Sequence, residues 1–295
     1  MSPVLTIFSA PKAFRGHVGI IQDNAIRSWS RLRPAPKIIL FGAESETGDL
    51  AQRVQVDLVP DVAQNTHGTP LLSDMFSRAN SMAAGDVLAF VSADIILGQS
   101  LIEATRIVAS WSNNFLLVAQ RRDVDVRESL DFDAGPDTAL GGISARGRLH
   151  SPGAIDLFVY RRGQYAGMPP FAIGRTAYDN WLLWNTMDSG IPLVDATDYV
   201  TLLHQNHDYL HAPTVDVWYG VEARENRQWI KHWTNYYTIT HADWAMGADG
   251  HIARTTAWRY RMSRPRQMLA YALRGTRRYR QRLRSTLQRA MRQRA

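Results

Sequence analysis

The segment Asp86-Val-Leu-Ala-Phe-Val-Ser-Ala-Asp94-Ile-Ile-Leu97 decides the fold prediction. Its continuous apolar run is typical of a parallel strand that is covered on both faces. Ser92-Ala-Asp94 then interrupts the run, and burying a carboxylate there requires a cation, hydrogen-bond donors or a metal. Because ligands bind beyond the carboxyl ends of strands in open α/β sheets, we expect Asp94 at a ligand site. A capping role before a helix at Ser100 is the competing interpretation.

Strand and helix patterns alternate on both sides of this segment. Apolar runs predict strands at residues 4–8, 37–41, 56–59, 86–97, 115–119, 154–160, 193–195 and 199–203. Helical periodicity predicts helices at 17–31, 47–54, 68–83 (with Pro70 in the first turn), 100–111 and 177–188 (capped by Thr176). Residues 121–150 are polar, charged and glycine-bearing, which favours a long loop. Alternation of this kind predicts an α/β fold with a mostly parallel central sheet.

Composition excludes several classes of protein. The chain has 295 residues, of which 45% are hydrophobic and 21% charged, as in globular domains. It contains no cysteine, which excludes a disulfide framework and thiolate chemistry. It has no run of about 18 apolar residues, so we expect no membrane-spanning helix. It also lacks the glycine-rich motifs of dinucleotide-binding folds and P-loops.

Charge is unevenly distributed along the chain. Residues 254–295 hold 14 Arg and no acidic residue, whereas residues 1–253 hold 20 basic and 27 acidic residues. From residue 265 to 295, apolar positions recur at spacings of three and four, which predicts a basic amphipathic helix. Such a helix favours an anionic membrane surface, with a partner subunit as the alternative. Nucleic acid is not the expected partner because the rest of the chain is acidic.

Four side chains suggest catalytic chemistry. Asp94 ends a strand, and Asp179 lies in the first turn of a predicted helix, where the helix dipole favours an ionised carboxylate. His204 and His207 follow a strand at a spacing that suits metal ligation. Imidazole and carboxylate together suit a divalent ion such as Mn²⁺. The alternatives are a capping role for Asp179 and a chance spacing of the two histidines.

The sequence resembles the GT-A nucleotide-sugar-dependent glycosyltransferases, and within them a family 2-like branch of bacterial and plant proteins. The general resemblance is carried by the α/β half that ends at Asp94, which matches the last Asp of the family's DXD motif. Ser92 departs from that motif, because it stands where the first Asp would be. The resemblance to the branch is carried by Gly147-Arg-Leu-His150, Asp156-Leu-Phe-Val-Tyr160, Pro169-Pro-Phe-Ala-Ile-Gly-Arg175, Tyr178-Asp-Asn-Trp-Leu182 and His204-Gln-Asn-His207.

The resemblance implies a role for each matching residue. Asp94 would bind Mn²⁺ or Mg²⁺ together with His204 or His207. Asp179 would be the catalytic base that takes the proton of the acceptor hydroxyl in inverting members. The nucleotide-sugar would contact Ser9, Ala10, Pro11, Glu44, Arg78, Ser92, Ala93, Asp94 and Arg175. The acceptor would contact Asp156, Asn180 and Trp181.

The resemblance also implies a domain organisation. Residues 1–253 would form one GT-A domain, with a nucleotide-binding half at 1–120 and an acceptor and catalytic half at 121–253. Residues 254–295 would form the basic helical tail. The implied location is the cytoplasm, with the protein peripherally attached to the inner face of the cell membrane.

The implied activity is transfer of a sugar from a UDP- or GDP-sugar to a hydroxyl of a glycan or lipid-linked acceptor. Cell-surface polysaccharide synthesis is the pathway that the resemblance implies. A sugar-1-phosphate nucleotidylyltransferase is the enzymatic alternative, although no glycine-rich phosphate loop follows the first strand. A catalytically degenerate scaffold that binds sugar or membrane is the non-enzymatic alternative, because Ser92 replaces the first Asp of the motif.

Overall fold

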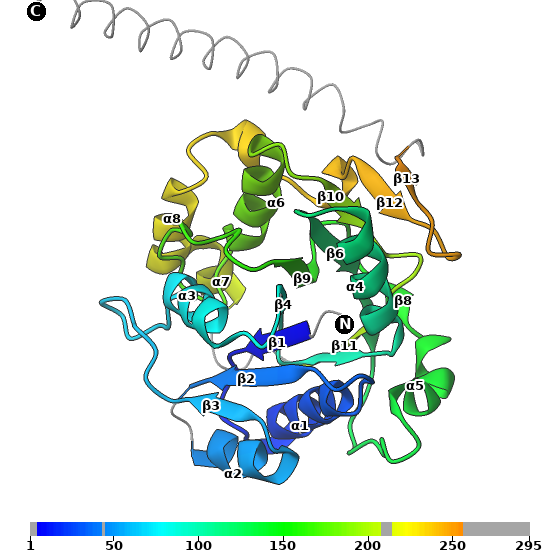
Figure 1. The fold of residues 1–295 in the computed structure, drawn as a ribbon. Coiled ribbons are helices and arrows are strands. Elements are labelled where there is room, and N and C mark those ends of the chain that lie inside the picture. The colour runs from blue at the N-terminus through cyan, green and yellow to red at the C-terminus, as the bar shows by residue number, and fades with distance from the viewer. Residues whose placement is uncertain (1–4, 43–44, 208–213, 256–295) are drawn as a thin grey trace, which may run out of the picture.

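The computed structural model describes residues 5–42, 45–207 and 214–255. Glu44 and the basic helix predicted at residues 265–295 lie outside the described residues. The described chain forms two β-sheets with helices packed around them (Figure 1). None of the helices in these ranges combines the length and apolarity that a membrane crossing requires.

A nine-stranded sheet forms the centre of the fold. Five of its eight pairings are parallel, which confirms the predicted α/β class with a mostly parallel central sheet. Strand β9 is antiparallel to both of its neighbours, β4 and β6. In spatial order the strands are β13 (Ile252–Arg254), β12 (Trp244–Met246), β10 (Leu193–Asp195), β6 (Leu116–Gln120), β9 (Ile155–Arg161), β4 (Val87–Val91), β1 (Leu5–Ser9), β2 (Lys37–Phe41) and β3 (Asp57–Val59).

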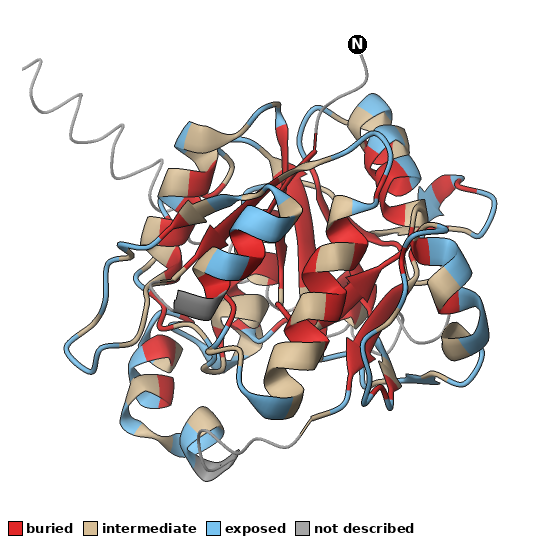
Figure 2. Ribbon diagram, turned by 90° about the horizontal axis from the view of Figure 1, so that it is seen from below, coloured by how far each residue is buried: buried red, intermediate tan, exposed pale blue. Residues whose placement is uncertain are grey.

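Helices cover both faces of this sheet. One apolar cluster packs α1 (Gly16–Ser30), α2 (Ser45–Val54) and α4 (Ser100–Trp111) against one face. A second cluster packs α3 (Leu72–Met82) and α6 (Tyr178–Asp188) against the other face. The central strands are therefore buried on both sides, as Figure 2 shows, and this explains why β4 has a continuous apolar sequence.

A smaller sheet of four strands lies beside the large one. Its order is β5 (Ile95–Leu97), β11 (Leu202–Gln205), β7 (Arg122–Val124) and β8 (Arg148–Leu149). Helix α5 (Pro136–Ser144) packs on it through a third apolar cluster, which includes Leu140. The remaining elements are α7 (Thr214–Tyr219), α8 (Val221–Gln228) and two short 3₁₀ turns, η1 (Trp233–Asn235) and η2 (Ile239–His241).

The chain passes from the large sheet to the small one at Ser92-Ala-Asp94. Strand β4 ends at Val91 in the large sheet, and β5 begins at Ile95 in the small sheet. The buried Trp29 ring on α1 holds this passage, since its Nε1 donates to the Ile95 carbonyl at 2.8 Å. Ile95 pairs with His204 across the β5–β11 ladder, so Asp94 is brought to the histidine pair.

Three predictions about local structure are wrong. Residues 121–150 are not a long loop, because they form β7, α5 and β8. The helix predicted from residue 68 begins at Leu72, because Pro70 and Leu71 form bridges with Gln64 and Ala172 instead. Thr176 does not cap α6; the residue before the helix is Ala177, which has a left-handed backbone (φ 91°) and no capping side chain.

Candidate active site

The candidate site lies at the point where the chain reverses its direction across the large sheet. From β1 the chain continues to β2 and β3 on one side, and it later returns as β4 on the other side. The carboxyl ends of β1 and β4 therefore border the crevice in which open α/β sheets bind ligands. The Ser9 hydroxyl donates to the Val91 carbonyl at 2.6 Å and joins these two ends. A cavity at this place is lined by Ser9, Ala10, Lys12, Ser92, Ala93, Asp94, Tyr178 and His207, among others.

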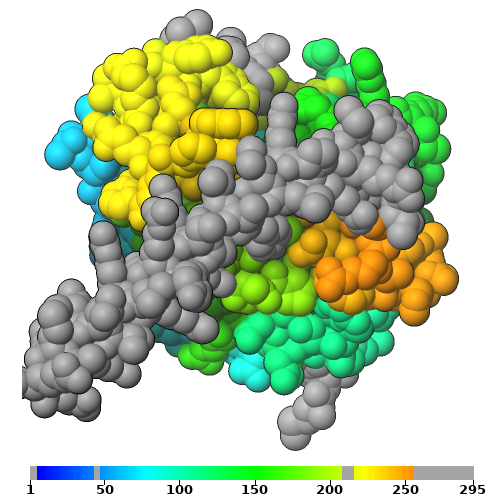
Figure 3. All heavy atoms as spheres, turned by 90° about the horizontal axis from the view of Figure 1, so that it is seen from above, coloured from blue at the N-terminus to red at the C-terminus, as the bar shows by residue number. Residues whose placement is uncertain are grey.

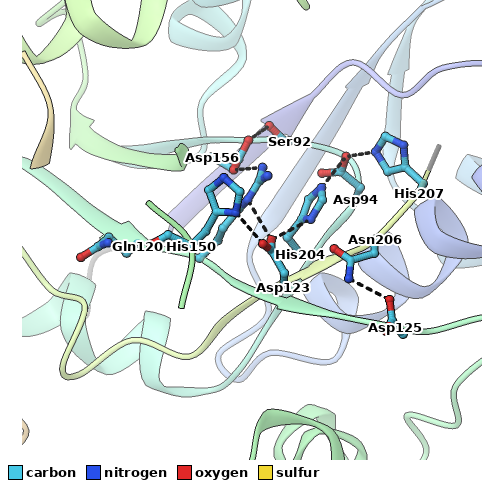
Figure 4. Close-up of polar contacts among 11 residues, drawn as sticks. Ser92, Asp94, Gln120, Asp123, Asp125, His150, Asp156, His204, Asn206 and His207 are labelled. Carbon is cyan, nitrogen blue, oxygen red and sulfur yellow. Dashed lines mark hydrogen bonds and ion pairs between the residues drawn. The ribbon is translucent and has the colours of Figure 1, made fainter. Parts of the chain in front are cut away.

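Asp94, His204 and His207 meet at the edge of this cavity (Figure 4). The Nε2 atom of His207 lies 3.1 Å from Asp94 Oδ2, and the Nε2 atom of His204 lies 3.7 Å from the same oxygen. Each side chain offers one ligand atom, and the three atoms lie within 4.8 Å of one another. The structure thus brings together all three residues that the sequence proposed as metal ligands, and it gives no support to a capping role for Asp94.

The protonation states of these groups suit metal binding. Burial disfavours the charged form of Asp94, but the His207 hydrogen bond and the His204, His207 and Lys12 charges outweigh it and lower the pKa of Asp94 to about 2. Burial and the nearby Arg121 lower the pKa of His204, although neighbouring carboxylates oppose them. At neutral pH an ionised carboxylate therefore faces a neutral imidazole, and these are the forms that bind metal ions.

The donor set fits a divalent cation. Two imidazole nitrogens and a carboxylate oxygen suit Mn²⁺ better than Mg²⁺, which prefers oxygen ligands. The Oδ1 atom of Asp94 is buried and has no hydrogen-bond partner among the described residues. An unpaired oxygen of this kind is costly in a protein interior, and a bound cation would satisfy it.

Asp123 connects His204 to two further basic side chains. Its Oδ1 lies 3.1 Å from His204 Nδ1 and 3.2 Å from Arg121 Nε, and its Oδ2 lies 2.5 Å from His150 Nδ1. Burial would raise the pKa of Asp123, but the His150 hydrogen bond and the Arg121 charge lower it below its usual range. A carboxylate beside the far nitrogen of a ligating histidine orients the ring and increases its basicity. Asp123 is placed to do this for His204.

Asp156 belongs to the same network through Arg121. The Arg121 guanidinium donates to Asp156 Oδ2 at 2.7 Å, and the Ser92 hydroxyl donates to Asp156 Oδ1 at 2.9 Å. The position that departs from the DXD motif thus carries a hydroxyl that binds a carboxylate of the neighbouring strand β9. The acceptor role of Asp156 stays a prediction.

A second cavity, of about 450 Å³, lies beyond the ends of β1 and β2. Ala10, Lys12 and Gly174 line both cavities, which places the two side by side. The Gln22 side chain fixes the loop after β1, because it bonds the Lys12 N–H at 2.6 Å and the Lys12 carbonyl at 2.9 Å. Two further predicted nucleotide-binding residues, Pro11 and Arg175, line this second cavity.

Lys12 and Arg175 bring positive charge to the cavities. Burial lowers the pKa of Lys12, the Asp94 charge opposes this, and the Arg175 charge adds to it. Both cations therefore lie within electrostatic range of each other at the site. The Arg175 guanidinium is held by Glu222, with an Nη2–Oε2 distance of 2.6 Å. The arrangement suits an anionic ligand that extends from Asp94 into the second cavity.

Asp179 lies in the first turn of α6 as predicted, but its surroundings disfavour the ionised carboxylate on balance. Burial raises the pKa of Asp179 to about 6, with the Asp156 charge adding to the rise and backbone N–H groups opposing it. Burial therefore outweighs the helix-terminal effect expected from the sequence. Burial also raises the pKa of Tyr178, and the Asp179, Asp156 and Asp94 charges raise it further. Tyr178 is thus within electrostatic range of both Asp179 and Asp94.

Three predicted binding residues have other partners. Arg78 Nε donates to Asp74, one turn earlier on α3. Asn180 Nδ2 donates to the Tyr237 carbonyl at 2.7 Å. Trp181 is 6% exposed and lies in the apolar core. The positions of Asn180 and Trp181 indicate that they hold α6 in place. Within the described residues, no hydrogen bond or ion pair joins Arg78 to the residues that line the two cavities.

The sequence did not single out Lys12, Arg121 or Asp123. The last two lie in the stretch that was predicted to be a loop, where β7 pairs Asp123 in register with His204. The alternation of acidic and apolar residues in Asp123-Val-Asp-Val126 is the signal that could have predicted a strand. Their contacts, however, join segments that are far apart in the chain.

Comparisons with known proteins found similarity in solved structures. No family model and no curated protein matches the sequence. Glucosyl-3-phosphoglycerate synthase of M. tuberculosis aligns with a TM-score of 0.46 at 15% identity, over 78% of this chain and 80% of that chain. S. aureus TarS 1-349 with UDP-GlcNAc aligns with a TM-score of 0.48 at 10% identity, over 72% of this chain and 62% of that chain. The mannosyltransferase PcManGT of Pyrobaculum calidifontis, with GDP-Man and Mn²⁺, aligns with a TM-score of 0.46 at 12% identity, over 71% of this chain and 59% of that chain.

We expect Asp94→Asn to abolish Mn²⁺ binding, because the amide supplies no charge to hold the ion between the imidazoles. Electron paramagnetic resonance of free Mn²⁺ measures this directly without any substrate. Asp125→Asn is the matched control, since Asp125 is an exposed acid that contacts Asn206 at 2.8 Å beside His207. Equal Mn²⁺ binding by wild type and Asp94→Asn would remove Asp94 from the metal site.

We expect Asp123→Asn to weaken Mn²⁺ binding about 10- to 100-fold, because it removes the charge that orients His204. The same titration measures this, and circular dichroism checks that the fold is retained. Asp125→Asn again serves as the control, two residues further along the chain. An unchanged Mn²⁺ affinity would show that Asp123 serves only to pair with Arg121 and His150.

Proposed function

We propose that this protein is a metal-dependent, inverting glycosyltransferase that moves a sugar from a nucleoside-diphosphate sugar to a hydroxyl group of a glycan or lipid-linked acceptor. The proposal is carried by one observation: Asp94, His204 and His207 meet at the switch point of the sheet. Tyr178, beside this group, is also within electrostatic range of Asp179. Tyr178 lines the cavity that Asp94 and His207 border, and the candidate base Asp179 directly follows it on α6.

The cavities suit a nucleoside-diphosphate donor. A volume of about 450 Å³ falls in the range of small-molecule sites, and the cavity begins next to Lys12 and Asp94. We assign the nucleoside to this cavity and the diphosphate to the space between Lys12 and Asp94. A divalent ion held by Asp94, His204 and His207 would neutralise the charge that develops on the departing diphosphate.

Asp179 is suited to act as the base. A carboxyl group with a pKa of about 6 is ionised at neutral pH and still accepts a proton readily in the transition state. When the acceptor oxygen attacks the anomeric carbon from the side opposite the diphosphate, Asp179 takes the hydroxyl proton and the configuration inverts. UDP- and GDP-sugars are the candidate donors.

A donor screen tests the proposal. Purified protein is incubated with UDP-glucose, UDP-N-acetylglucosamine and GDP-mannose in Mn²⁺, and the released nucleoside diphosphate is measured. We expect slow hydrolysis of at least one donor, which EDTA suppresses and Asp94→Asn abolishes. Absence of release from a wider set of nucleotide-sugars, with thermal stabilisation by nucleoside triphosphate alone, would favour a nucleotidylyltransferase instead.

Asp179→Asn gives a further prediction with two opposite effects. Transfer should be lost by at least about 100-fold, since general base catalysis contributes 10²- to 10⁴-fold. Stability should rise: a pKa raised from 3.8 to about 6 means that the folded state loses stability as pH increases through this interval. The variant should therefore be more stable than wild type by about 3 kcal/mol well above pH 6 and equal to it below pH 4.

Wild-type transfer should fall as the pH drops through 6, because protonation removes the base. Asp188→Asn, at the other end of α6, is the control and should retain the wild-type pH profile. Full transfer activity of Asp179→Asn would eliminate Asp179 as the base, and an unchanged stability difference across pH would contradict its raised pKa.

A further inference from the structure

An exposed aromatic surface stands next to the candidate site. Seven large hydrophobic residues are exposed among the described residues, and six of them fall between positions 218 and 236. Figure 3 shows the segment that carries them in yellow, gathered on one side of the molecule. We define the aromatic surface as Trp218, Tyr219, Trp229, Trp233 and Tyr236, of which Trp218, Tyr219 and Trp233 are 53%, 67% and 64% exposed. Exposed apolar residues gathered in this way mark a binding site.

Two arginines of α8 hold the first aromatic pair in place. Arg227 Nη1 donates to the Trp218 carbonyl, and Arg224 Nη1 donates to the Tyr219 carbonyl at 2.6 Å. These bonds satisfy carbonyl groups at the end of α7, where cations are favoured. The Arg227 guanidinium also lies 5.8 Å from the centre of the Tyr219 ring. The aromatic pair is therefore presented on a fixed backbone, which lowers the entropy lost on binding.

Buried side chains hold the segment that carries Trp233 and Tyr236. Asn235 is buried and donates to the Ile230 carbonyl at 2.7 Å, which closes the turn that presents Trp233. Tyr237 is 1% exposed and stacks on His241 with ring centres 4.4 Å apart. The exposed rings thus extend from a segment that other side chains, Asn235 and Tyr237, attach to the core.

The aromatic surface reaches the candidate site at two points. Val217, the residue before Trp218, lines the 450 Å³ cavity. At the other point, Asn180 beside the candidate base donates to the Tyr237 carbonyl. Burial raises the pKa of Tyr236, and the charges of Arg227 and Asp179 act on it in opposite directions. Tyr236 therefore lies within electrostatic range of Asp179.

The composition of the surface indicates the class of its ligand. Residues 214–241 hold three acidic and three basic side chains, so the segment has no net charge to attract an anionic membrane. Its exposed large apolar residues are Trp and Tyr with one Val, and the segment contains none of the Leu and Phe that are typical of membrane-inserting faces. Trp and Tyr combine a rigid flat face with a polar edge, which matches the apolar faces and hydroxyl groups of sugar rings.

We propose that the aromatic surface binds the acceptor as a carbohydrate chain, whose sugar rings stack on Trp218, Tyr219 and Trp233 while its terminal hydroxyl reaches Asp179. This assignment rests on the proposed function, since it makes the surface the acceptor site of that transferase. Several sugar residues are engaged at once, because the surface offers several separate aromatic rings. Stacking at exposed aromatics contributes most of the affinity and sets no strict requirement for one sugar.

The test uses the full chain on a printed array of microbial and plant oligosaccharides, followed by calorimetry with the best-bound oligosaccharide. We expect wild type to bind, and the double variant Trp218→Ala/Trp233→Ala to lose at least tenfold in affinity. The double variant Trp218→Phe/Trp233→Phe should keep affinity within about threefold, because the flat rings remain. Leu149→Ala, which removes an exposed apolar side chain outside residues 218–236, is the matched control and should bind as wild type does.

Several outcomes would overturn the assignment. These are no array binding by wild type, equal binding by the Ala double variant, or binding to phosphatidylglycerol vesicles that needs the two Trp residues while glycans are ignored. Loss of folding is excluded by the melting temperature, which substitution of exposed side chains should change little. Trp-dependent glycan binding without hydrolysis of any nucleotide-sugar would instead refute the proposed function and leave a carbohydrate-binding site.

Discussion

The contact between the Asp94 carboxylate and the two imidazoles is the interaction on which the site depends. A buried carboxylate is costly unless it is paired, and here His207 and His204 lie 3.1 and 3.7 Å from one oxygen. The pairing requires the chain to leave the large sheet after Val91 and to join β11 in the small sheet. The boundary between the two sheets is therefore also the place where the three candidate metal ligands converge.

A polar network behind this contact joins the two sheets. Arg121 lies between Asp123 of the small sheet and Asp156 of the large one, and Ser92 bonds the same Asp156. Each of the two carboxylates is thus paired with the Arg121 guanidinium, and Asp156 also accepts a hydroxyl hydrogen bond. Such networks hold a site in one geometry, since moving any member leaves another charge unpaired. The orientation of His204 is thus coupled to the packing of both sheets.

Around Asp179, burial has more influence on the side chains than ion pairing does. Asp179 lies in the first turn of a helix, where an ionised carboxylate is usually favoured, yet burial raises its pKa to about 6. The aromatic side chains near Asp179 form two groups, one in the core and one on the surface. Trp181 and Tyr237 are buried and fix the helix, whereas Trp218 and Trp233 project from anchored backbone. The exposed rings give this part of the surface an apolar character that the charged surroundings of Asp94 lack.

The sequence by itself determined the α/β class, the strand that ends before Asp94, and the four side chains with chemistry: Asp94, Asp179, His204 and His207. Periodicity and residue type carry that information because they are local. Only the tertiary structure decided that Asp123 supports His204, that residues 121–150 form strands and a helix, and which aromatics are exposed. These features depend on contacts between distant segments and on burial, which no local pattern in a single chain records.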